Sequence, residues 1–419
     1  MSYHYVLPEV VAALASDDFF MRAKSQATRF SYAEAVLELA ERNPQIVVLD
    51  ADVSKSMNTN KFAEKFPERE FNFGIAEQNM MAAAAGMATT GLIPFASTYA
   101  VFASMRALDQ VRNSIHYPHL NVKIAASHSG ITPGPDGVTH QAQEDLSLLR
   151  SIATSTVVAP ADAVTTKLAT WAAAAWDGPV YLSFTRDPVP VLFDSNYPFQ
   201  IGKAVVVRDG GDATIIANRD IVAHALVAAE KLAHAGLDIR VIDCHTIKPL
   251  DVDVILRAAR ETGAIVTAEN NIIFGGLGSA VAETLVENYP IPMERIGVRD
   301  TFAESGPYLD VIDKYGLTAP HIINAVKRVI ERKKNSASRF ARTRRADGDG
   351  GSRTTCHFQA RRNSNRHENR RRVRIRGPRV SRHTSVPQTA RDPGPRSGWR
   401  YRRHRQRGQR IQSRRPRDR

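Results

Sequence analysis

Short apolar runs of five or six residues, separated by stretches with helical periodicity, constrain the fold of this chain more than any other feature. Runs of this length without polar alternation are typical of strands that are buried on both faces of a parallel sheet. The first set of runs spans 45–49, 122–126 and 180–184, and the second spans 213–217, 238–243 and 264–268. The pattern predicts an α/β fold with two consecutive doubly wound domains and mostly parallel sheets.

A stretch rich in Pro, Asn and Gly, from Pro188 to Gly202, separates the two sets and lacks apolar periodicity, so we place a linker there. We expect the first 25 residues to form a short helix and a connector. Without these residues and the C-terminal tail, about 310 residues remain, which is enough for two domains of ordinary size. The expected boundaries are 1–25 for the helix and connector, 26–190 for the first domain, 191–203 for the linker, 204–334 for the second domain and 335–419 for the tail.

The C-terminal tail accounts for the basic character of the chain, whose formal net charge is +14 and whose pI is near 9.9. Residues 336–419 contain 27 Arg, no Lys and 5 acidic residues, so they carry +22 and the first 335 residues carry −8. A segment with so few aliphatic residues cannot bury enough apolar surface to order itself. We therefore expect a disordered, Arg-rich tail.

Two explanations of this tail are open. The abrupt change of composition after Glu331-Arg332-Lys333-Lys334 favours a shifted reading frame in GC-rich DNA, where arginine codons are frequent. An Arg-rich arm that binds RNA or DNA is the alternative. Because the globular part is acidic, we expect no nucleic-acid partner for it. Gly348-Asp349-Gly350 in the tail lacks the flanking strand and helix of a metal-binding motif.

Cysteine content and hydropathy indicate a soluble, cytoplasmic protein. The two cysteines, Cys244 and Cys356, are too few for a disulfide framework and are not spaced for a metal site. No stretch of 18 apolar residues occurs, and the segment Met1 to Tyr5 does not begin a signal peptide. We expect no membrane partner.

The segment from Phe71 to His140 holds the most informative polar residues. Glu77 lies in an Ala- and Met-rich helical run with almost no polar neighbours in sequence, and burial there favours the neutral, protonated carboxyl. A neutral carboxyl can donate a hydrogen bond to a ring nitrogen of a bound ligand. The alternative is an exposed Glu near a helix N-terminus, where it interacts with the helix dipole.

Several spaced motifs together resemble the C-terminal half of transketolase, over about residues 27–332. They are Ala27-Thr28-Arg29, Asp50-Ala51-Asp52-Val53-Ser54-Lys55-Ser56, Phe73-Gly74-Ile75-Ala76-Glu77, Pro94-Phe95-Ala96-Ser97-Thr98-Tyr99, His128-Ser129-Gly130, Gly134-Pro135-Asp136-Gly137-Val138-Thr139-His140-Gln141 and Phe184-Thr185-Arg186. The resemblance implies a pyrimidine-binding domain with the thiamin-diphosphate-binding fold, followed by a transketolase C-terminal domain. It also implies transfer of a two-carbon ketol unit with thiamine diphosphate as cofactor.

The resemblance implies that Glu77 acts on the cofactor and that Tyr99 and Phe102 pack on its aminopyrimidine ring. These two aromatic residues are three positions apart, so a helix or tight turn places both rings in one pocket. Two core aromatics are the alternative. Asp52 matches a family position near the thiazolium and the dimer interface. Met105 stands where transketolases often have another aromatic residue, which is a departure from the pattern.

A Pro- and Gly-rich loop between His128 and His140 can bring Asp136 and both imidazoles to one rim. The resemblance implies that His128 contacts the substrate phosphate and Asp136 the hydroxyl next to the reacting carbonyl. It implies that His140 contacts the carbonyl oxygen and its neighbouring hydroxyl, where a His can give or take a proton near neutral pH. Solvated loop histidines that cap a turn are the alternative.

Arg29, Ser56 and Arg186 are distant in sequence, but each falls next to an expected strand end or helix start, where α/β sheets place ligands. An Arg side chain suits phosphate because its planar fork donates two parallel hydrogen bonds. The resemblance assigns these three residues to the sugar-phosphate end of the substrate. Surface ion pairing is the alternative for either Arg alone.

The resemblance also implies what must come from a partner. A complete transketolase has a preceding domain that binds the diphosphate through Mg2+, with a Gly-Asp-Gly motif and a downstream Asn. We assign no metal ligand to this chain and expect a separately encoded N-terminal subunit to supply the oxygen ligands of Mg2+. The expected assembly is α2β2 and acts on a sugar phosphate. Several pentose, hexose and branched sugars share the phosphate and hydroxyls that these residues would contact.

Two other functions are open. The β subunit of a 2-oxo acid dehydrogenase has the same fold and a similar segment near Asp109-Gln110-Val111, but its substrates have no phosphate for the residues above to bind. The other is a truncated or misread product that binds the partner without turnover, or that binds nucleic acid through the tail.

A Gly-rich segment from Glu269 to Ser279 leads into a helix and is typical of a turn that holds an anion on backbone N–H groups. Its spacing is not Gly-x-Gly-x-x-Gly, and no ribose-binding acid follows at the usual distance. We therefore expect close packing of strand on helix there rather than a dinucleotide site.

Overall fold

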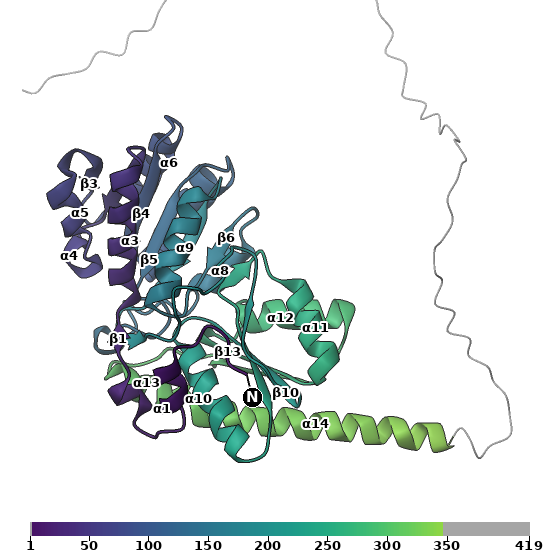
Figure 1. Cartoon of the computed structure of the whole chain (residues 1–419). Coiled ribbons are helices and arrows are strands. Elements are labelled where there is room, and N and C mark those ends of the chain that lie inside the picture. The colour runs from purple at the N-terminus through teal and green to yellow at the C-terminus, as the bar shows by residue number, and fades with distance from the viewer. Residues whose placement is uncertain (1, 347–419) are drawn as a thin grey trace, which may run out of the picture. The chain divides into compact units, whose positions relative to one another are not determined.

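The computed structural model describes residues 2–346. The chain divides into two units, Met1–Gly351 and Ser352–Arg419, and the described residues all belong to the first. This unit contains two mostly parallel sheets with helices packed on them (Figure 1). The prediction of an α/β fold with two consecutive sheets is confirmed.

The first sheet has seven strands in the order β12-β6-β7-β5-β4-β2-β3. Its neighbours pair in parallel, except that β12 runs antiparallel to β6. The strands are β2 (Ile46–Asp50), β3 (Glu70–Asn72), β4 (Ile93–Tyr99), β5 (Lys123–Ser127), β6 (Thr156–Val158), β7 (Val180–Ser183) and β12 (Thr246–Lys248).

Helices cover both faces of this sheet. The helices in the first half of the chain are α1 (Pro8–Ala13), α2 (Phe19–Arg22), α3 (Thr28–Arg42), α4 (Ser54–Met57), α5 (Asn60–Lys65), α6 (Glu77–Ala88), α7 (Leu108–Gln110), α8 (Asp145–Ser151) and α9 (Ala163–Ala175), with 3-10 segments at Pro67–Arg69 and Gly134–Asp136 and π-helical segments at Phe102–Arg106 and Val111–His116. Alternate residues of β2 enter different cores. Ile46 and Val48 face the core beneath α3 and α9, which lie side by side in Figure 1, whereas Val47 and Leu49 face the core that contains α6 and α8.

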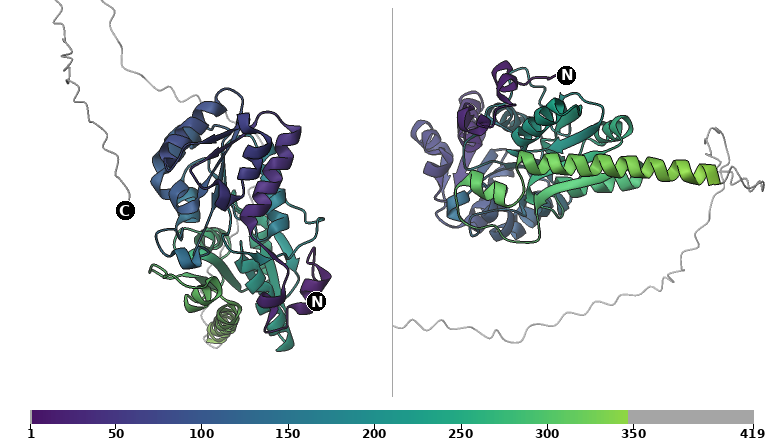
Figure 2. Two further views of the ribbon diagram at one scale, coloured as in Figure 1. Left: turned by 90° about the vertical axis from the view of Figure 1, so that its left-hand side faces the viewer. Right: turned by 90° about the horizontal axis from the view of Figure 1, so that it is seen from below.

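The second sheet has five strands in the order β14-β13-β10-β11-β9, parallel except for β9. The strands are β9 (Val205–Arg208), β10 (Ala213–Ala217), β11 (Ile239–Asp243), β13 (Ile265–Ile272) and β14 (Met293–Val298), and the helices are α10 (Ile221–His234), α11 (Val252–Thr262), α12 (Leu277–Asn288), α13 (Tyr308–Lys314) and α14 (Ala319–Ala346). Figures 1 and 2 show α10 and α14 beside this sheet, and α11 and α12 pack on each other. The core of α11 and α12 is continuous with that of α6 and α8.

The two halves share a buried junction. At the start of the Pro-, Asn- and Gly-rich stretch from Pro188 to Gly202, β8 (Val189–Pro190) pairs antiparallel with β1 (Ser25–Gln26). The strand β12 belongs to the second half in sequence but extends the first sheet. A buried ion pair, Arg219 Nη1 to Asp145 Oδ2 at 3.5 Å, also joins the halves. These contacts fix the edge of the first sheet against the second half.

The structure differs from the expected start of the tail at residue 335, because α14 continues to Ala346. Ala and Arg are strong helix formers, and the extension of an existing helix avoids the cost of nucleation. The rest of the tail, 347–419, lies outside the described residues, together with Cys356 and the Gly348-Asp349-Gly350 segment.

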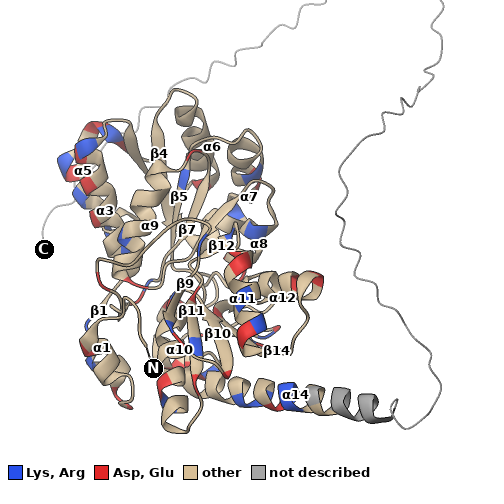
Figure 3. Cartoon of the chain, turned by 45° about the vertical axis from the view of Figure 1, so that its right-hand side comes forward, with Lys and Arg blue, Asp and Glu red and all other residues tan. Residues whose placement is uncertain are grey.

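Polarity follows the layers. Charged residues lie mainly on helices and loops, and the strands are mostly uncharged (Figure 3). Lys123 in β5 is an exception, because its buried Nζ donates to the carbonyl oxygens of Trp176 and Gly178 at 2.6 and 2.8 Å. Burial lowers the pKa of Lys123 to about 7. Among residues 2–346, no helix has the length and apolar character needed to cross a membrane.

Candidate active site

The predicted site residues converge at the carboxyl ends of neighbouring parallel strands. Tyr99 ends β4 and His128 follows β5. Asp52 comes shortly after β2, and Arg186 comes shortly after β7. These strands are adjacent in the order β7-β5-β4-β2, which explains how residues distant in sequence meet. In open α/β sheets, ligands bind at this edge.

Glu77 is the first residue of α6, and its side chain is 2% exposed. Nη1 of Arg106 donates to both of its carboxylate oxygens, at 3.1 Å to Oε1 and 2.9 Å to Oε2. The expected burial is present, and a cation 29 residues along the chain pairs with the carboxylate, which the residues around Glu77 in sequence did not indicate. The alternative of an exposed Glu at a helix N-terminus is correct about the N-terminus and wrong about the exposure.

Four rings form one aromatic wall beside Glu77. Tyr99 stacks on His128, with centroids 3.7 Å apart, and on Phe102 at 5.8 Å. Phe102 meets the ring of His140 edge-on at 5.7 Å. The pairing of β4 with β5 explains the first stack, because Tyr99 lies opposite the residue that precedes His128. Phe102 begins a π-helical segment instead of the expected helix or tight turn, and such segments occur frequently at functional sites.

His128 is held in its neutral form. Its side chain is buried, and Nδ1 lies 2.8 Å from Ser127 Oγ. Burial lowers the pKa of His128 to about 2, and the positive charges of Arg29 and Arg186 act in the same direction. Its backbone φ of +62° is in the left-handed region, and strain of this kind clusters at functional sites. His128 is therefore a neutral hydrogen-bonding group near pH 7.

The loop between the two histidines directs its groups to different neighbours. Asp136 ends the 3-10 segment Gly134–Asp136, and its Oδ2 pairs with Nε of Arg186 at 3.0 Å. His140 Nδ1 lies 3.0 Å from Thr139 Oγ1, while the ring of His140 contacts the aromatic wall. The loop thus links the wall to Arg186.

Arg29, Ser56 and Arg186 meet as one cluster. Nε of Arg29 donates to the carbonyl oxygen of Arg186 at 2.9 Å. Nη1 of Arg29 donates to the Oγ of Ser56 at 3.2 Å and to its carbonyl oxygen. Arg186 uses Nε for Asp136 and Nη1 for Asp187, the latter at 2.6 Å. Within the described part of the chain, Nη2 of Arg29 and Nη2 of Arg186 have no hydrogen-bond partner.

Sequence reasoning missed Arg106 and Asp187. Arg106 lies four residues after Phe102, and this spacing places two side chains on the same face of a helix. The spacing is therefore a sequence signal for the contact between Arg106 and Phe102. Asp187 directly follows Arg186, which is too common an arrangement to stand out. Asp52 is exposed with a φ of +62°, and its side chain makes no hydrogen bond or ion pair with other described residues.

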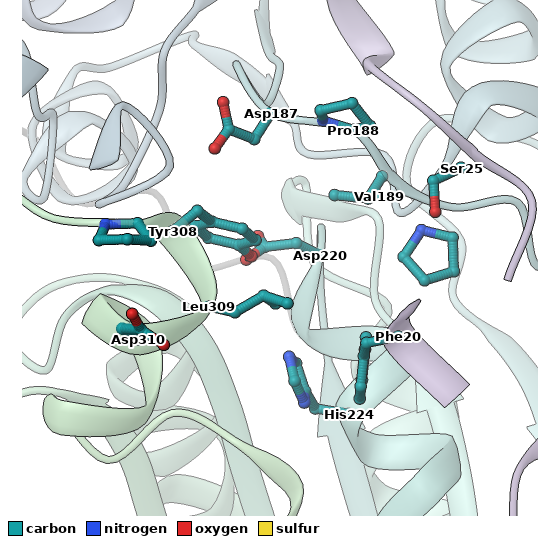
Figure 4. A pocket seen from close by; sticks show the side chains of 12 residues that line it. Phe20, Ser25, Asp187, Pro188, Val189, Asp220, His224, Tyr308, Leu309 and Asp310 are labelled. Atoms are coloured by element: carbon teal, nitrogen blue, oxygen red, sulfur yellow. The ribbon is translucent and has the colours of Figure 1, made fainter. Parts of the chain in front are cut away.

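A cavity of about 360 Å3 lies at the junction of the two halves, apart from the predicted site residues (Figure 4). Its wall includes Asp187, and His224 stacks there on Phe20 with centroids 4.0 Å apart. Tyr308 donates to Asp220 Oδ2 at 2.5 Å in the same wall. None of the residues that line this cavity belongs to the aromatic wall.

The backbone N–H groups of the Gly-rich turn before α12 bind the carboxylate of Glu269. The backbone N–H groups of Leu277 and Gly278 each donate to a carboxylate oxygen of Glu269 at 2.8 Å. Burial raises the pKa of Glu269 to about 7. The expected close packing of strand on helix is confirmed. In the described residues, no group of three or more His, Cys, Asp or Glu side chains is placed to hold a metal ion.

Two family models match the chain over most of the described residues. The transketolase pyrimidine binding domain matches residues 24–191, and the transketolase C-terminal domain matches residues 202–322. The chain belongs to the transketolase family. The predicted resemblance is therefore confirmed, and a pyrimidine-binding domain implies thiamine diphosphate as the cofactor.

Two relatives that are matched over nearly their full length are named as transketolase subunits. The chain is 44% identical over 315 residues to the 6-deoxy-6-sulfo-D-fructose transketolase subunit SqwH of Clostridium sp. (strain MSTE9), with coverage of 75% of this chain and 98% of that protein. It is 37% identical over 292 residues to an apulose-4-phosphate transketolase subunit of Phocaeicola vulgatus, covering 70% and 93%. A solved structure, "Split gene transketolase, inactive beta4 tetramer", matches with a TM-score of 0.69 and 48% identity, over 74% of this chain and 100% of that chain.

Proposed function

We propose that this chain is the C-terminal subunit of a split transketolase, which transfers a two-carbon ketol unit from a ketose phosphate to an aldose together with an N-terminal subunit. One observation carries the proposal. A buried carboxylate, an aromatic wall and a pair of arginines meet at one sheet edge, as ketol transfer from a phosphorylated sugar requires.

The residues present fit the pyrimidine half of thiamine diphosphate. Tyr99 and Phe102 offer flat apolar faces for stacking, and Glu77 lies buried near Phe102 through Arg106. When bound, the cofactor supplies a carbon nucleophile and an electron sink. The role of Glu77 is to donate a hydrogen bond to the ring nitrogen in its protonated form. The wall excludes water from that contact.

The cluster of Arg29, Ser56 and Arg186 fits the substrate phosphate. Arg29 is oriented by hydrogen bonds through Nε and Nη1, Arg186 is oriented by ion pairs through the same two nitrogens, and each keeps Nη2 available. Donors that are already oriented lose little side-chain entropy when phosphate binds. We assign His128, which is neutral, to a hydrogen bond with the same phosphate.

The remaining two residues act at the sugar. We assign Asp136 to the hydroxyl beside the reacting carbonyl, because its pair with Arg186 holds it near the phosphate cluster. We assign His140 to the carbonyl oxygen, where it holds and moves a proton. Its ring contacts Phe102, which places it at the cofactor end of the site.

The partner subunit would supply the diphosphate site with Mg2+ and complete an α2β2 assembly. The names of the two relatives, each called a transketolase subunit, support a partner. Three large apolar side chains near Glu77 and Phe102 in sequence are exposed, namely Phe71 at 36%, Ile75 at 76% and Met105 at 38%. Exposed apolar groups of this size are typical of protein–protein contacts.

The test is reconstitution. The chain is mixed with the candidate N-terminal subunit, thiamine diphosphate and Mg2+, and ketol transfer from xylulose 5-phosphate is compared with turnover of pyruvate. We expect activity with the ketose phosphate only in the mixture, and a loss of at least about 100-fold in the Glu77→Gln variant. The Glu68→Gln variant, which alters an exposed side chain, is the control. Full activity of the isolated chain would contradict the proposal, and so would turnover of pyruvate without turnover of the ketose phosphate.

A further inference from the structure

In this chain, Arg106 contacts two of the three residues assigned to the pyrimidine ring, Glu77 and Phe102. One nitrogen of its guanidinium, Nη1, contacts both oxygens of Glu77, at 3.1 and 2.9 Å. The centre of the guanidinium, Cζ, lies 4.2 Å from the centroid of the Phe102 ring. The same planar group therefore stacks on the aromatic wall and donates to the buried carboxylate.

An aminopyrimidine would make the same two kinds of contact, a stack on an aromatic ring and a hydrogen bond with the carboxyl. A guanidinium group can fill the same place because it is planar and stacks readily on aromatic faces, although it donates to the ionised carboxylate, whereas the ring nitrogen accepts from the protonated carboxyl. We propose that Arg106 is an internal substitute for the pyrimidine ring, which occupies the ring's place until the cofactor binds. The inference rests on the proposed function and concerns how the cofactor gains access to Glu77.

The surroundings of Arg106 allow it to leave. Its side chain is 45% exposed, whereas that of Glu77 is 2% exposed. Within the described residues, Glu77 is the single hydrogen-bond partner of the Arg106 guanidinium. Arg106 also ends the π-helical segment Phe102–Arg106. The cation can therefore turn into solvent, while the carboxylate remains where it is.

The contact between Arg106 and Glu77 stabilises the chain when no cofactor is bound. A buried carboxylate without a partner is strongly unfavourable, and Arg106 satisfies it. The cofactor must then displace an existing ion pair, so part of its binding free energy is used to release Arg106. Removal of Arg106 should therefore tighten cofactor binding, which is opposite to the effect expected for a residue that holds the cofactor.

The experiment measures binding rather than turnover. Thiamine diphosphate is titrated into the assembled complex with Mg2+, and its dissociation constant is obtained by calorimetry and by near-ultraviolet circular dichroism. We expect Arg106→Gln to lower the dissociation constant by about two- to fivefold, the effect of losing one partly exposed ion pair. The matched control is Arg112→Gln, a few residues further along, whose side chain contacts Asn113 and is exposed.

Arg106→Lys provides a second variant that keeps a charge beside Glu77 but loses the planar stack on Phe102. It should tighten binding by a smaller factor than Arg106→Gln, and it keeps the test valid if Arg106→Gln does not fold. Weaker or unchanged binding in these variants, with the control equal to wild type, overturns the inference. If the wild-type complex itself binds no thiamine diphosphate, the proposed function fails instead, so the two failures are distinguishable.

Discussion

At the scale of single residues, Arg29 offers the most specific test of substrate recognition. Its Nε and Nη1 are fixed by Arg186 and Ser56, which leaves Nη2 for phosphate. Lysine cannot reproduce this fork, so Arg29→Lys should raise KM for a ketose phosphate by about 10- to 100-fold, in line with the loss of a hydrogen bond to a charged group. Steady-state kinetics of the reconstituted complex measures this change.

Two comparisons make that result interpretable. Arg42→Lys, at the exposed end of α3, should leave KM unchanged. A non-phosphorylated ketose should show little difference between wild type and Arg29→Lys. An equal loss with both sugars would mean that Arg29 supports the loop around Ser56 and does not bind the phosphate.

The sequence allowed most of the candidate site to be predicted, because its residues lie in motifs with fixed spacing at strand ends. It could not show Arg106, since the pair with Glu77 depends on how α6 packs beside the π-helical segment. The prediction for Glu77 rested on its neighbours in sequence. Neighbours in sequence are apolar there, but the neighbour in space is a cation.

At the scale of elements, the turn that starts α12 depends on Glu269. Its carboxylate accepts from Leu277 and Gly278, and a Cβ placed on Gly276 would lie 2.2 Å from Glu269 Oε2. The carboxylate cannot move without losing both bonds, so Gly276→Ala should lower the free energy of unfolding by about 1–3 kcal/mol. Urea denaturation measures it, with Gly211→Ala as control, because a Cβ there meets no atom within 4 Å. Equal stability of the two variants would show that the turn adapts.

A second prediction at this scale concerns helix α10 and the loss of stability at acidic pH. His224 is buried against Phe20, and burial lowers its pKa to about 3, against about 6.5 in the unfolded chain. Between these values the unfolded state binds one more proton at this residue. The stability that neutral His224 contributes is therefore complete above pH 6.5 and falls by about 1.4 kcal/mol per pH unit below it.

The measurement compares how steeply the free energy of unfolding changes with pH in each variant, rather than the free energies themselves. His224→Gln, which does not titrate, should reduce the fall in unfolding free energy between pH 6 and 4.5 by about 1.4 kcal/mol per unit, as measured by urea unfolding at several pH values. His234→Gln, in the same helix but 65% exposed, should leave the slope unchanged. Identical slopes for wild type and His224→Gln would show that His224 is protonated in the folded protein.

Elements were predictable to different degrees. The runs 213–217 and 238–243 became β10 and β11 almost without change, because a buried parallel strand leaves a continuous apolar run in the sequence. The strand β12 was not foreseen, since three residues of an antiparallel edge carry no such run. The end of α14 was also missed, because the Arg-rich composition that predicts disorder is compatible with the extension of a helix.

At the scale of the whole molecule, charge separates an acidic body from a basic tail, and this contrast gives the last prediction. The first 335 residues carry −8, and a chain that ends at Ala346 loses 23 of the tail's 27 Arg. Nucleic-acid affinity of the full chain would come from phosphate neutralisation by these Arg residues and would fall steeply with salt. The shortened chain keeps every predicted site residue.

We therefore expect it to retain ketol transfer with the partner subunit and to lose binding of labelled single-stranded RNA at low salt, as measured by fluorescence anisotropy. Loss of ketol transfer on truncation would instead give the tail a part in catalysis or assembly, which a product of a shifted reading frame would not have.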